Sequence, residues 1–280
     1  MSTEPHSCNH LIQWAIDAIR GDSPRLDAEL LLAEVTGWSR TSFRAWPERD
    51  VPVEHESRFR MLVNQRAEGH PVAHLLGLQE FWSLPLKVNP TTLIPRADTE
   101  CLVEAALELP LPESALVVDL GTGTGAIALA LASERPLWQV SACDRVAGAV
   151  ALARANAEAL SLPVAIYQGS WFGGLPDIRF DLIISNPPYI AENDHHLARG
   201  DVRFEPHSAL VSGPDGLDDI RHIIAGSPDW LARHGWLVLE HGYDQGEAVR
   251  GIMADAGFED VATRQDYGHR DRLTLGRFEG

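Results

Sequence analysis

The fold is decided by the stretch Leu116-Val117-Val118-Asp119-Leu120-Gly121-Thr122-Gly123-Thr124-Gly125. Its first five residues are mostly apolar and include two β-branched valines, which predicts a short buried strand. The glycine-rich run follows at once, and Ala126–Ala132 after it has the composition of a buried helix. A strand, a glycine loop and a helix in this order open a dinucleotide-binding α/β fold, because small residues let the backbone approach a ligand. The pattern Gly121-x-Gly123-x-x-Ala126 also fits a relaxed NAD motif, so the loop alone does not identify that ligand.

Two aspartates are candidates for contacts with the ligand of this glycine loop. The next predicted strand, Gln139–Asp144, ends in a carboxylate one βα unit after the loop. An aspartate there can accept both hydroxyls of an adenosine ribose, or it can cap the following helix. Asp119, directly before the glycines, can face the positively charged end of S-adenosylmethionine (SAM). NAD has no ammonium group at that point, so Asp119 favours SAM.

Two further strand ends are candidates for ligand binding. Val164–Tyr167 predicts a third strand, and Trp171 near its carboxyl end can stack on adenine or pack in the core. Phe180–Ser185 predicts a fourth strand, which stops at Asn186-Pro187-Pro188-Tyr189.

The two prolines of this tetrapeptide make the backbone stiff and extended, and they remove two backbone donors. An amide NH2 group can donate one hydrogen to the Asn186 side-chain oxygen and the other to a backbone carbonyl such as that of Pro187. Tyr189 can then stack on the planar substrate group; the alternative is that Pro187-Pro188 only ends the strand and Tyr189 is core. The motif is typical of SAM-dependent methyltransferases that alkylate planar nitrogens, either glutamine amides or adenine amines.

The chain outside this region predicts a second, smaller part. Helical spacing marks Leu11–Ile19, Leu26–Val35 and Val53–Ala67, with Ser23-Pro24 as a start signal and Gly37 as a stop signal. Short extended pieces then follow as far as Pro95. We therefore predict three segments: an N-terminal helical domain at 1–75, a hairpin linker at 76–95, and the main domain at 96–280.

The main domain is predicted to be an α/β sheet covered on both faces. A helix is expected from about 95 to 109, where Arg96 and Glu100 form a helix-start ion pair or contribute to the site. A polar loop at 191–218 is long enough to act as a lid or substrate guide. The remaining predicted elements are a helix at 217–233, a strand at 235–240, a helix at 245–256, and strands near 259–264 and 271–277.

Composition limits the classes of partner. The formal charge is −17 and the only lysine is Lys87, which disfavours a nucleic-acid substrate and favours a protein with a basic surface. Three scattered cysteines without CxxC spacing indicate a reducing cytoplasm and no zinc, and adjacent His195-His196 is better explained as a solvated loop. No apolar run is long enough to span a bilayer, and the N-terminus lacks a signal pattern, so we expect no membrane association.

Taken together, these motifs resemble the HemK-type protein-(glutamine-N5) methyltransferases, and most closely the peptide chain release factor glutamine methyltransferases. The matching pieces are Arg66-Ala67-Glu68-Gly69-His70-Pro71, Phe81-Trp82, Thr92-Leu93-Ile94-Pro95-Arg96-Ala97-Asp98-Thr99-Glu100, Asp119 through Gly125, Asn186 through Tyr189, Glu205-Pro206 and Leu239-Glu240-His241-Gly242. They extend over nearly the whole chain. The departures are Ala97 where the family usually has proline, His74 where tyrosine is common, and Ser170 where aspartate often precedes the tryptophan.

The resemblance implies a seven-stranded, Rossmann-like SAM-dependent methyltransferase domain whose last strand is antiparallel, and a small N-terminal helical domain. We expect this helical domain to dock substrate, and a purely structural role is the alternative. The resemblance also implies SAM as cofactor, and as substrate the glutamine of the Gly-Gly-Gln motif in class I peptide chain release factors; we expect a monomer. Carried over by position, the catalytic residues are Asn186, Pro187 and Tyr189, which with Pro188 hold the glutamine amide. The cofactor residues are Asp119, Gly121, Thr122, Gly123, Thr124, Gly125, Asp144, Trp171 and Asn186.

Four alternatives remain open from the residues. A ribosomal-protein glutamine methyltransferase shares the mechanism, and a DNA adenine-N6 methyltransferase shares the Asn-Pro-Pro-Tyr logic. A non-catalytic SAM-binding protein would have no use for an amide-sized acceptor platform. An NAD dehydrogenase accounts for the glycine loop but not for residues 186–189.

Overall fold

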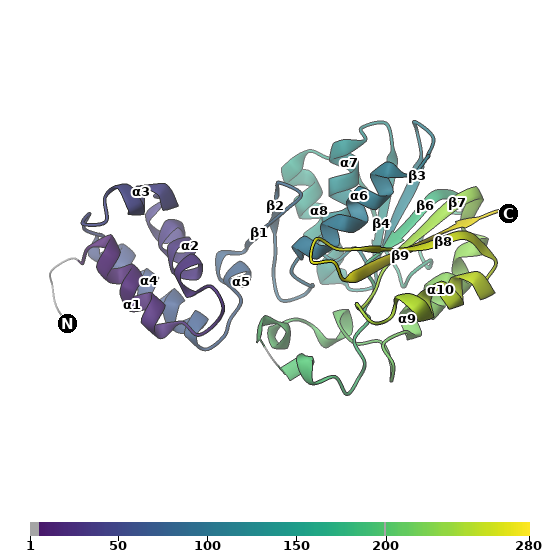
Figure 1. The fold of residues 1–280 in the computed structure, drawn as a ribbon. Coiled ribbons are helices and arrows are strands. Elements are labelled where there is room, and N and C mark those ends of the chain that lie inside the picture. Colours follow the sequence, from purple (N-terminus) through teal and green to yellow (C-terminus); the bar gives the residue numbers. More distant parts are fainter. Residues whose placement is uncertain (1–5, 199) are drawn as a thin grey trace. The chain divides into compact units, whose positions relative to one another are not determined.

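The computed structural model describes residues 6–198 and 200–280, and the chain divides into two compact units (Figure 1). One unit comprises Met1–Leu78 with Ala198–Phe204, and the other comprises Gln79–Leu197 with Glu205–Gly280. The functional domain limits at residues 75 and 95 stay a prediction.

The first unit is helical. Its helices are α1 (Cys8–Ala18), α2 (Pro24–Thr36), α3 (Arg40–Ala45), α4 (Val53–Ala67) and α5 (Val72–Leu76). Pro24 occupies the first turn of α2, and Gly37 ends that helix in the left-handed conformation with φ 69°. Sequence analysis missed α3 and α5, because six and five residues are too few to show a helical period.

Part of the long polar loop belongs to this helical unit. Arg66 donates from Nη1 to Asp201 Oδ1 at 2.9 Å and from Nε to Asp27 Oδ2 at 2.7 Å. Arg203 donates from Nη2 to the Glu68 carbonyl at 2.7 Å. The loop also contains the short 3-10 helices η2 (His195–Ala198), η3 (Gly200–Phe204) and η4 (His207–Ala209), which sequence analysis had not predicted.

The second unit contains a seven-stranded sheet in the order β5-β4-β3-β6-β7-β9-β8. The strands are β3 (Leu116–Leu120), β4 (Gln139–Asp144), β5 (Ala165–Gln168), β6 (Phe180–Ser185), β7 (Leu231–Glu240), β8 (Phe258–Gln265) and β9 (Asp271–Phe278). β9 pairs antiparallel with β7 and β8, whereas the other neighbours are parallel. The predicted α/β class, with seven strands and an antiparallel last strand, is confirmed.

Helices cover both faces of this sheet, as predicted (Figure 1). The helices α6 (Glu100–Glu108), α7 (Ala126–Glu134) and α8 (Ala147–Leu160) lie over one face, and α9 (Asp218–Gly226) and α10 (Gly246–Asp255) over the other. Successive strand residues point to opposite faces, so each strand contributes to two apolar cores. The buried residues alternate accordingly: Val117, Leu182 and Val238 lie in one core, and Val118, Ile183 and Leu237 in the other.

Two predicted elements were wrong in extent. The helix expected at 217–233 ends at Gly226, and a 3-10 turn at Ser227–Asp229 leads into β7, which begins at Leu231. Pro228 ends the helix, and Leu231 pairs with Phe180 across a register shift in β6. Thr92–Pro95, expected as an extended piece, forms no strand.

The predicted hairpin consists of β1 (Leu78–Phe81) and β2 (Leu84–Lys87). Asn156 on α8 ties the hairpin to the glycine loop, because it is 1% exposed and accepts at Oδ1 from the Lys87 N–H at 2.8 Å. Its Nδ2 donates to the carbonyls of Lys87 at 3.0 Å and Thr124 at 2.9 Å. One side chain thus satisfies three backbone groups.

Cysteines and hydropathy complete the description. Cys8, Cys101 and Cys143 are free and buried. Within the described ranges no helix combines the length and the apolar character that crossing a membrane requires.

Replacing Asn156 by alanine should destabilise the fold. Leaving these backbone groups without partners in a buried site should cost about 3 kcal/mol of unfolding free energy. Urea denaturation measures this loss, and Asn64→Ala, at an exposed position on α4, is the matched control that should change stability little. Equal stability of the two variants would show that water replaces the Asn156 contacts.

Candidate active site

The glycine loop connects β3 to α7 in a conformation that its residue types dictate. Gly121, Gly123 and Gly125 have φ values of 70°, 56° and 86°, which residues with a Cβ rarely adopt. The backbone N–H groups of Gly121 and Thr122 donate to the Cys143 carbonyl at 2.9 and 3.0 Å, so the loop is fixed to the end of β4. This leaves a tight turn whose outer side borders a cavity.

That cavity lies in the sheet-containing unit, at the carboxyl ends of the parallel strands. It is lined by the glycine loop, by the ends of β4, β5 and β6, and by the segments around 91–99 and 208–209. The predicted site residues among its walls are Gly121, Thr122, Gly123, Thr124, Asp144, Trp171, Asn186 and Pro188. Asp119, Gly125, Pro187 and Tyr189 are not among the lining residues.

Both carboxylate oxygens of Asp144 accept backbone hydrogen bonds, and its ribose binding stays a prediction. Its Oδ2 accepts from the Gly123 N–H at 3.0 Å, and its Oδ1 accepts from the Val146 N–H, at the start of α8, at 2.8 Å. The carboxylate therefore shapes the glycine loop and caps a helix while facing the cavity. Each oxygen has a second lone pair, so two ligand hydroxyls can still donate to it.

Trp171 forms a flat wall of the cavity beside the glycine loop. A Cβ at Gly121 would lie 3.3 Å from Trp171 Cζ3, so glycine is needed for the indole to come this close. The Cys143 thiol donates to the Trp171 carbonyl at 2.8 Å, and burial raises the pKa of that thiol to about 12. Cys143 is thus a neutral thiol that holds the backbone of Trp171.

Asp119 supports the loop from behind. It is fully buried, and its Oδ2 accepts from the Thr122 hydroxyl at 2.5 Å. Burial raises its pKa to about 7, although the Thr122 hydrogen bond favours the ionised form. Gly125 also acts within the fold, because a Cβ there would lie 3.1 Å from Leu129 Cδ1 and 3.3 Å from Ala153 Cβ.

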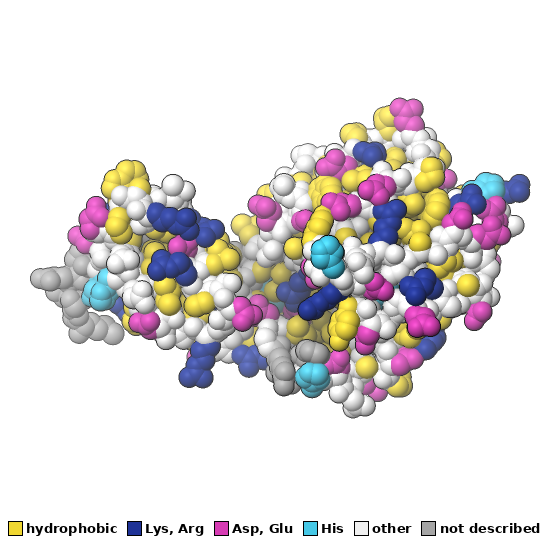
Figure 2. Space-filling view, viewed as in Figure 1, with side chains coloured by type: hydrophobic (Ala, Val, Ile, Leu, Met, Phe, Trp, Pro, Cys, Tyr) yellow, Lys and Arg dark blue, Asp and Glu magenta, His cyan; other side chains and the backbone are white. Residues whose placement is uncertain are grey.

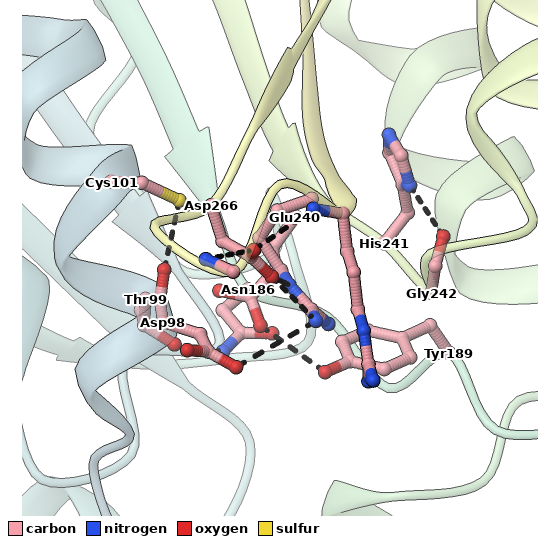
Figure 3. A network of polar contacts seen from close by, with 12 residues as sticks. Asp98, Thr99, Cys101, Asn186, Tyr189, Glu240, His241, Gly242 and Asp266 are labelled. Atoms are coloured by element: carbon pink, nitrogen blue, oxygen red, sulfur yellow. Dashed lines mark hydrogen bonds and ion pairs between the residues drawn. The ribbon is translucent and has the colours of Figure 1, made fainter.

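Asn186 follows the end of β6, and its amide is held by Thr99, which ends the 3-10 helix η1 (Ala97–Thr99) and precedes α6 (Figure 3). Its Nδ2 donates to Thr99 Oγ1 at 3.2 Å, which leaves Oδ1 as the acceptor that Asn186 offers to the cavity. Pro187 is buried, and Pro188 lines the cavity. An acceptor oxygen at the wall of a cavity can accept a hydrogen bond from the NH2 group of a ligand.

Tyr189 points away from the cavity, toward β7. Its hydroxyl donates to Glu240 Oε1 at 3.2 Å, and burial raises the pKa of the phenol (Figure 3). Its carbonyl accepts from Gln245 Nε2 at 3.0 Å. The stacking assigned to Tyr189 stays a prediction, since its ring is not part of the cavity wall.

Sequence reasoning missed several residues that build this site. Thr99 and Glu240 both lie within the resembling stretches, but nothing in their spacing showed that they hold Asn186 and Tyr189. Of the two interpretations of Arg96 and Glu100, the ion pair is wrong, because Arg96 pairs with Glu205, with Nη2 2.8 Å from Oε2, and Arg96 lines the cavity. Glu205 also accepts from the Ile94 N–H at 2.9 Å, and Glu100 accepts from the Trp82 N–H at 2.8 Å.

Comparison with known proteins follows the same division of the chain. Residues 10–77 match the family model of the PrmC N-terminal domain, and residues 98–203 match that of the methyltransferase small domain. A release factor glutamine methyltransferase of Pseudomonas aeruginosa is 57% identical over 260 residues, covering 92% of this chain and 94% of that one. The protein of the same name from Escherichia coli is 51% identical, covering 96% and 98% of the two chains. A methyltransferase structure from Pyrococcus furiosus shares the fold, with a TM-score of 0.54, 18% identity, and coverage of 70% and 89%.

The raised pKa of Asp119 predicts a pH dependence of stability. Its pKa of about 7 lies above the usual value of 3.8, so the folded state binds a proton more readily than the unfolded chain. The stabilisation is complete below pH 3.8 and is lost as the pH rises through about 7. As the pH rises from 3.8 to about 7, the melting temperature of Asp119→Asn should therefore increase relative to that of the wild type. Asp177→Asn, at an exposed position, should show no such trend.

Proposed function

The chain belongs to the release factor glutamine methyltransferase family, and from this premise we propose its substrate, cofactor and site. It transfers a methyl group from SAM to the side-chain amide nitrogen of the glutamine in the Gly-Gly-Gln motif of class I peptide chain release factors. The observation that carries this proposal is the orientation of Asn186, whose amide NH2 is used by Thr99 and whose oxygen remains for a substrate amide.

The residues around the cavity fit SAM. The glycine loop gives the backbone room for the methionine part, Asp144 has lone pairs for the ribose hydroxyls, and the Trp171 indole offers a flat face for adenine. Asp119 supports the loop through Thr122 and does not line the cavity. When bound, SAM supplies an electrophilic methyl group on its positively charged sulfur.

The chain's own residues supply orientation. A carboxamide nitrogen is a poor nucleophile, because its lone pair is delocalised into the carbonyl. Asn186 Oδ1 and the Pro187 carbonyl accept its two hydrogens, which turns the nitrogen toward the cavity and stabilises positive charge that grows on it. Positioning and electrostatics therefore account for most of the catalysis.

The partner assignment rests on family membership and on charge. We propose that residues 1–75 dock the release factor, and that the protein acts in the cytoplasm as a monomer. In Figure 2, Arg side chains are interspersed with Asp and Glu on the face shown and do not form one continuous basic stripe. With a formal charge of −17, this supports a protein substrate over DNA.

The proposed role of Asp144 predicts a loss of cofactor binding when its carboxylate is removed. Asp144→Ala should weaken SAM binding by about 1.5–3 kcal/mol, the scale of a hydrogen bond to a charged group. Titration calorimetry measures this loss. An analogue without ribose hydroxyls should lose much less from the same substitution; an equal loss would assign Asp144 to loop support alone.

A further prediction concerns the substrate and tests the proposed function directly. Incubation with SAM and an unmodified release factor should add one methyl group to the Gly-Gly-Gln glutamine, seen by intact mass and peptide mapping. Asn186→Ala should slow this step by roughly 10²-fold or more, the scale of one preorganised hydrogen-bonding group. Asp177→Asn is the control that should keep the normal rate.

Parallel substrates distinguish the alternatives. Methylation of a ribosomal protein in place of the release factor would keep the mechanism and change the partner. Methylation of adenine in DNA alone would contradict the argument from charge. A near-normal rate for Asn186→Ala would remove the proposed catalytic platform.

A further inference from the structure

Glu240 is a buried acid behind the Asn-Pro-Pro-Tyr motif. It ends β7, next to β6, and is 2% exposed. Burial raises its pKa to about 7, while Thr99, Arg272 and Tyr189 favour the ionised form. A group so costly to bury calls for an explanation that core packing does not provide.

Glu240 is hydrogen-bonded to one end of the motif, and the Thr99 side chain connects to the other end (Figure 3). The Tyr189 hydroxyl donates to Glu240 Oε1 at 3.2 Å. The Thr99 side chain is near enough to the carboxylate to favour its ionised form, and Glu240 Oε2, which is buried, has no other hydrogen-bond partner among the described residues. Thr99 Oγ1 accepts from Asn186 Nδ2 at 3.2 Å. A hydroxyl has one hydrogen, so Thr99 can accept from Asn186 and donate to Glu240 at the same time.

We propose that Glu240 is a positioning residue that fixes Asn186 through Thr99 and fixes Tyr189 directly. An ionised carboxylate only accepts, so every hydrogen in this chain of bonds points toward it. The Asn186 amide is thereby committed to one orientation, with NH2 toward Thr99 and oxygen toward the cavity. The inference rests on the proposed function, because that orientation is the one that accepts a substrate amide.

With a neutral group at position 240, the hydrogens of these bonds would no longer all point toward that residue. Glutamine or protonated glutamate offers a donor as well as an acceptor. Thr99 can then accept from residue 240 and donate to Asn186 Oδ1, which turns the Asn186 amide around. The aliphatic packing of the side chain is unchanged, so the effect is on orientation and not on volume.

Several charged or titratable groups lie around Glu240. Arg272 on β9 donates from Nε and Nη2 to Asp266 Oδ2 at 3.0 and 2.9 Å, and its Nη2 lies 3.7 Å from Asp98 Oδ2. Cys101 on α6 is neutral, because burial raises the pKa of its thiol to about 12. Arg272 is thus largely paired with Asp266, and it lessens the effect of burial on Glu240 without cancelling it.

Glu240→Gln tests the proposal in the full-length protein. Its single-turnover methylation rate should fall by about 10-fold or more, since misplacement of a positioning group reduces rates on this scale. SAM affinity should stay within about twofold, because Glu240 does not line the cavity. The wild-type rate should fall as the pH drops below about 7, where Glu240 takes up a proton, and this fall should be absent in Glu240→Gln.

A second measurement does not depend on activity. The side-chain NH2 signal of Asn186, assigned by its loss in Asn186→Ala, should exchange slowly with solvent in the wild type and at least about tenfold faster in Glu240→Gln. Asp181→Asn is the matched control at the opposite end of β6, where Oδ2 accepts from the Leu116 N–H at 2.8 Å. It should leave the rate, the pH profile and the Asn186 signal unchanged.

The outcomes separate this inference from the proposed function. A wild-type rate, pH profile and Asn186 signal in Glu240→Gln would overturn the inference. If that variant does not fold, Thr99→Val carries the test, and slow exchange of Asn186 in Thr99→Val would also overturn it. If the wild type methylates no glutamine, the proposed function fails, and the Asn186 exchange still decides whether Glu240 positions this amide.

Discussion

The parallel pairing of β3 with β6 is the constraint on which the site depends. Leu120 and Ser185 are partners in this pairing, and the Ser185 hydroxyl donates to the Leu120 carbonyl at 2.6 Å. Both strands therefore end at the same level, one in the glycine loop and the other in Asn186. The chain leaves β3 toward β4 on one side, while β6 lies on the other, so the strand order reverses at this point. Ligand sites of open α/β sheets form at such a reversal.

Much of this arrangement could be predicted from the sequence, because its signals are local. The Val-rich strand, the glycine loop and the Asp144 carboxylate follow one another at spacings set by a single βα unit. The two prolines after Ser185 likewise fix the backbone without help from distant residues. What could not be predicted depends on packing between elements. Thr99 meets Asn186 across 87 positions and Tyr189 meets Glu240 across 51, and these contacts exist only because α6 and β7 flank β6 in the fold.

The difference between local signals and packing also explains why only some of the predicted ligand residues line the cavity. Sequence motifs mark positions that the fold requires, and such positions need not touch a ligand. Asp119 holds Thr122, and Gly125 lets α7 pack against Ala153. Arg96 and Glu100, for which an ion pair was one of two interpretations, each have another partner, because the segment near Glu205 supplies a carboxylate to Arg96 and the hairpin supplies the Trp82 N–H to Glu100. An isolated helix gives no sign of either partner.

A buried acid at position 240 lowers the stability of the fold, but it restricts the orientation of the groups that bond to it. Replacing buried ionic groups by apolar ones of similar volume is often neutral or stabilising, so Glu240 is not needed to hold β7 in the core. An apolar side chain, however, accepts no hydrogen bond and would leave the Tyr189 and Thr99 hydroxyls free to rotate. The Asn186 amide would then have two nearly equivalent orientations, only one of which presents oxygen to a substrate NH2. On this proposal, the physical reason for a carboxylate at the end of β7 is that it gives a direction to hydrogen bonds that end at the Asn-Pro-Pro-Tyr motif.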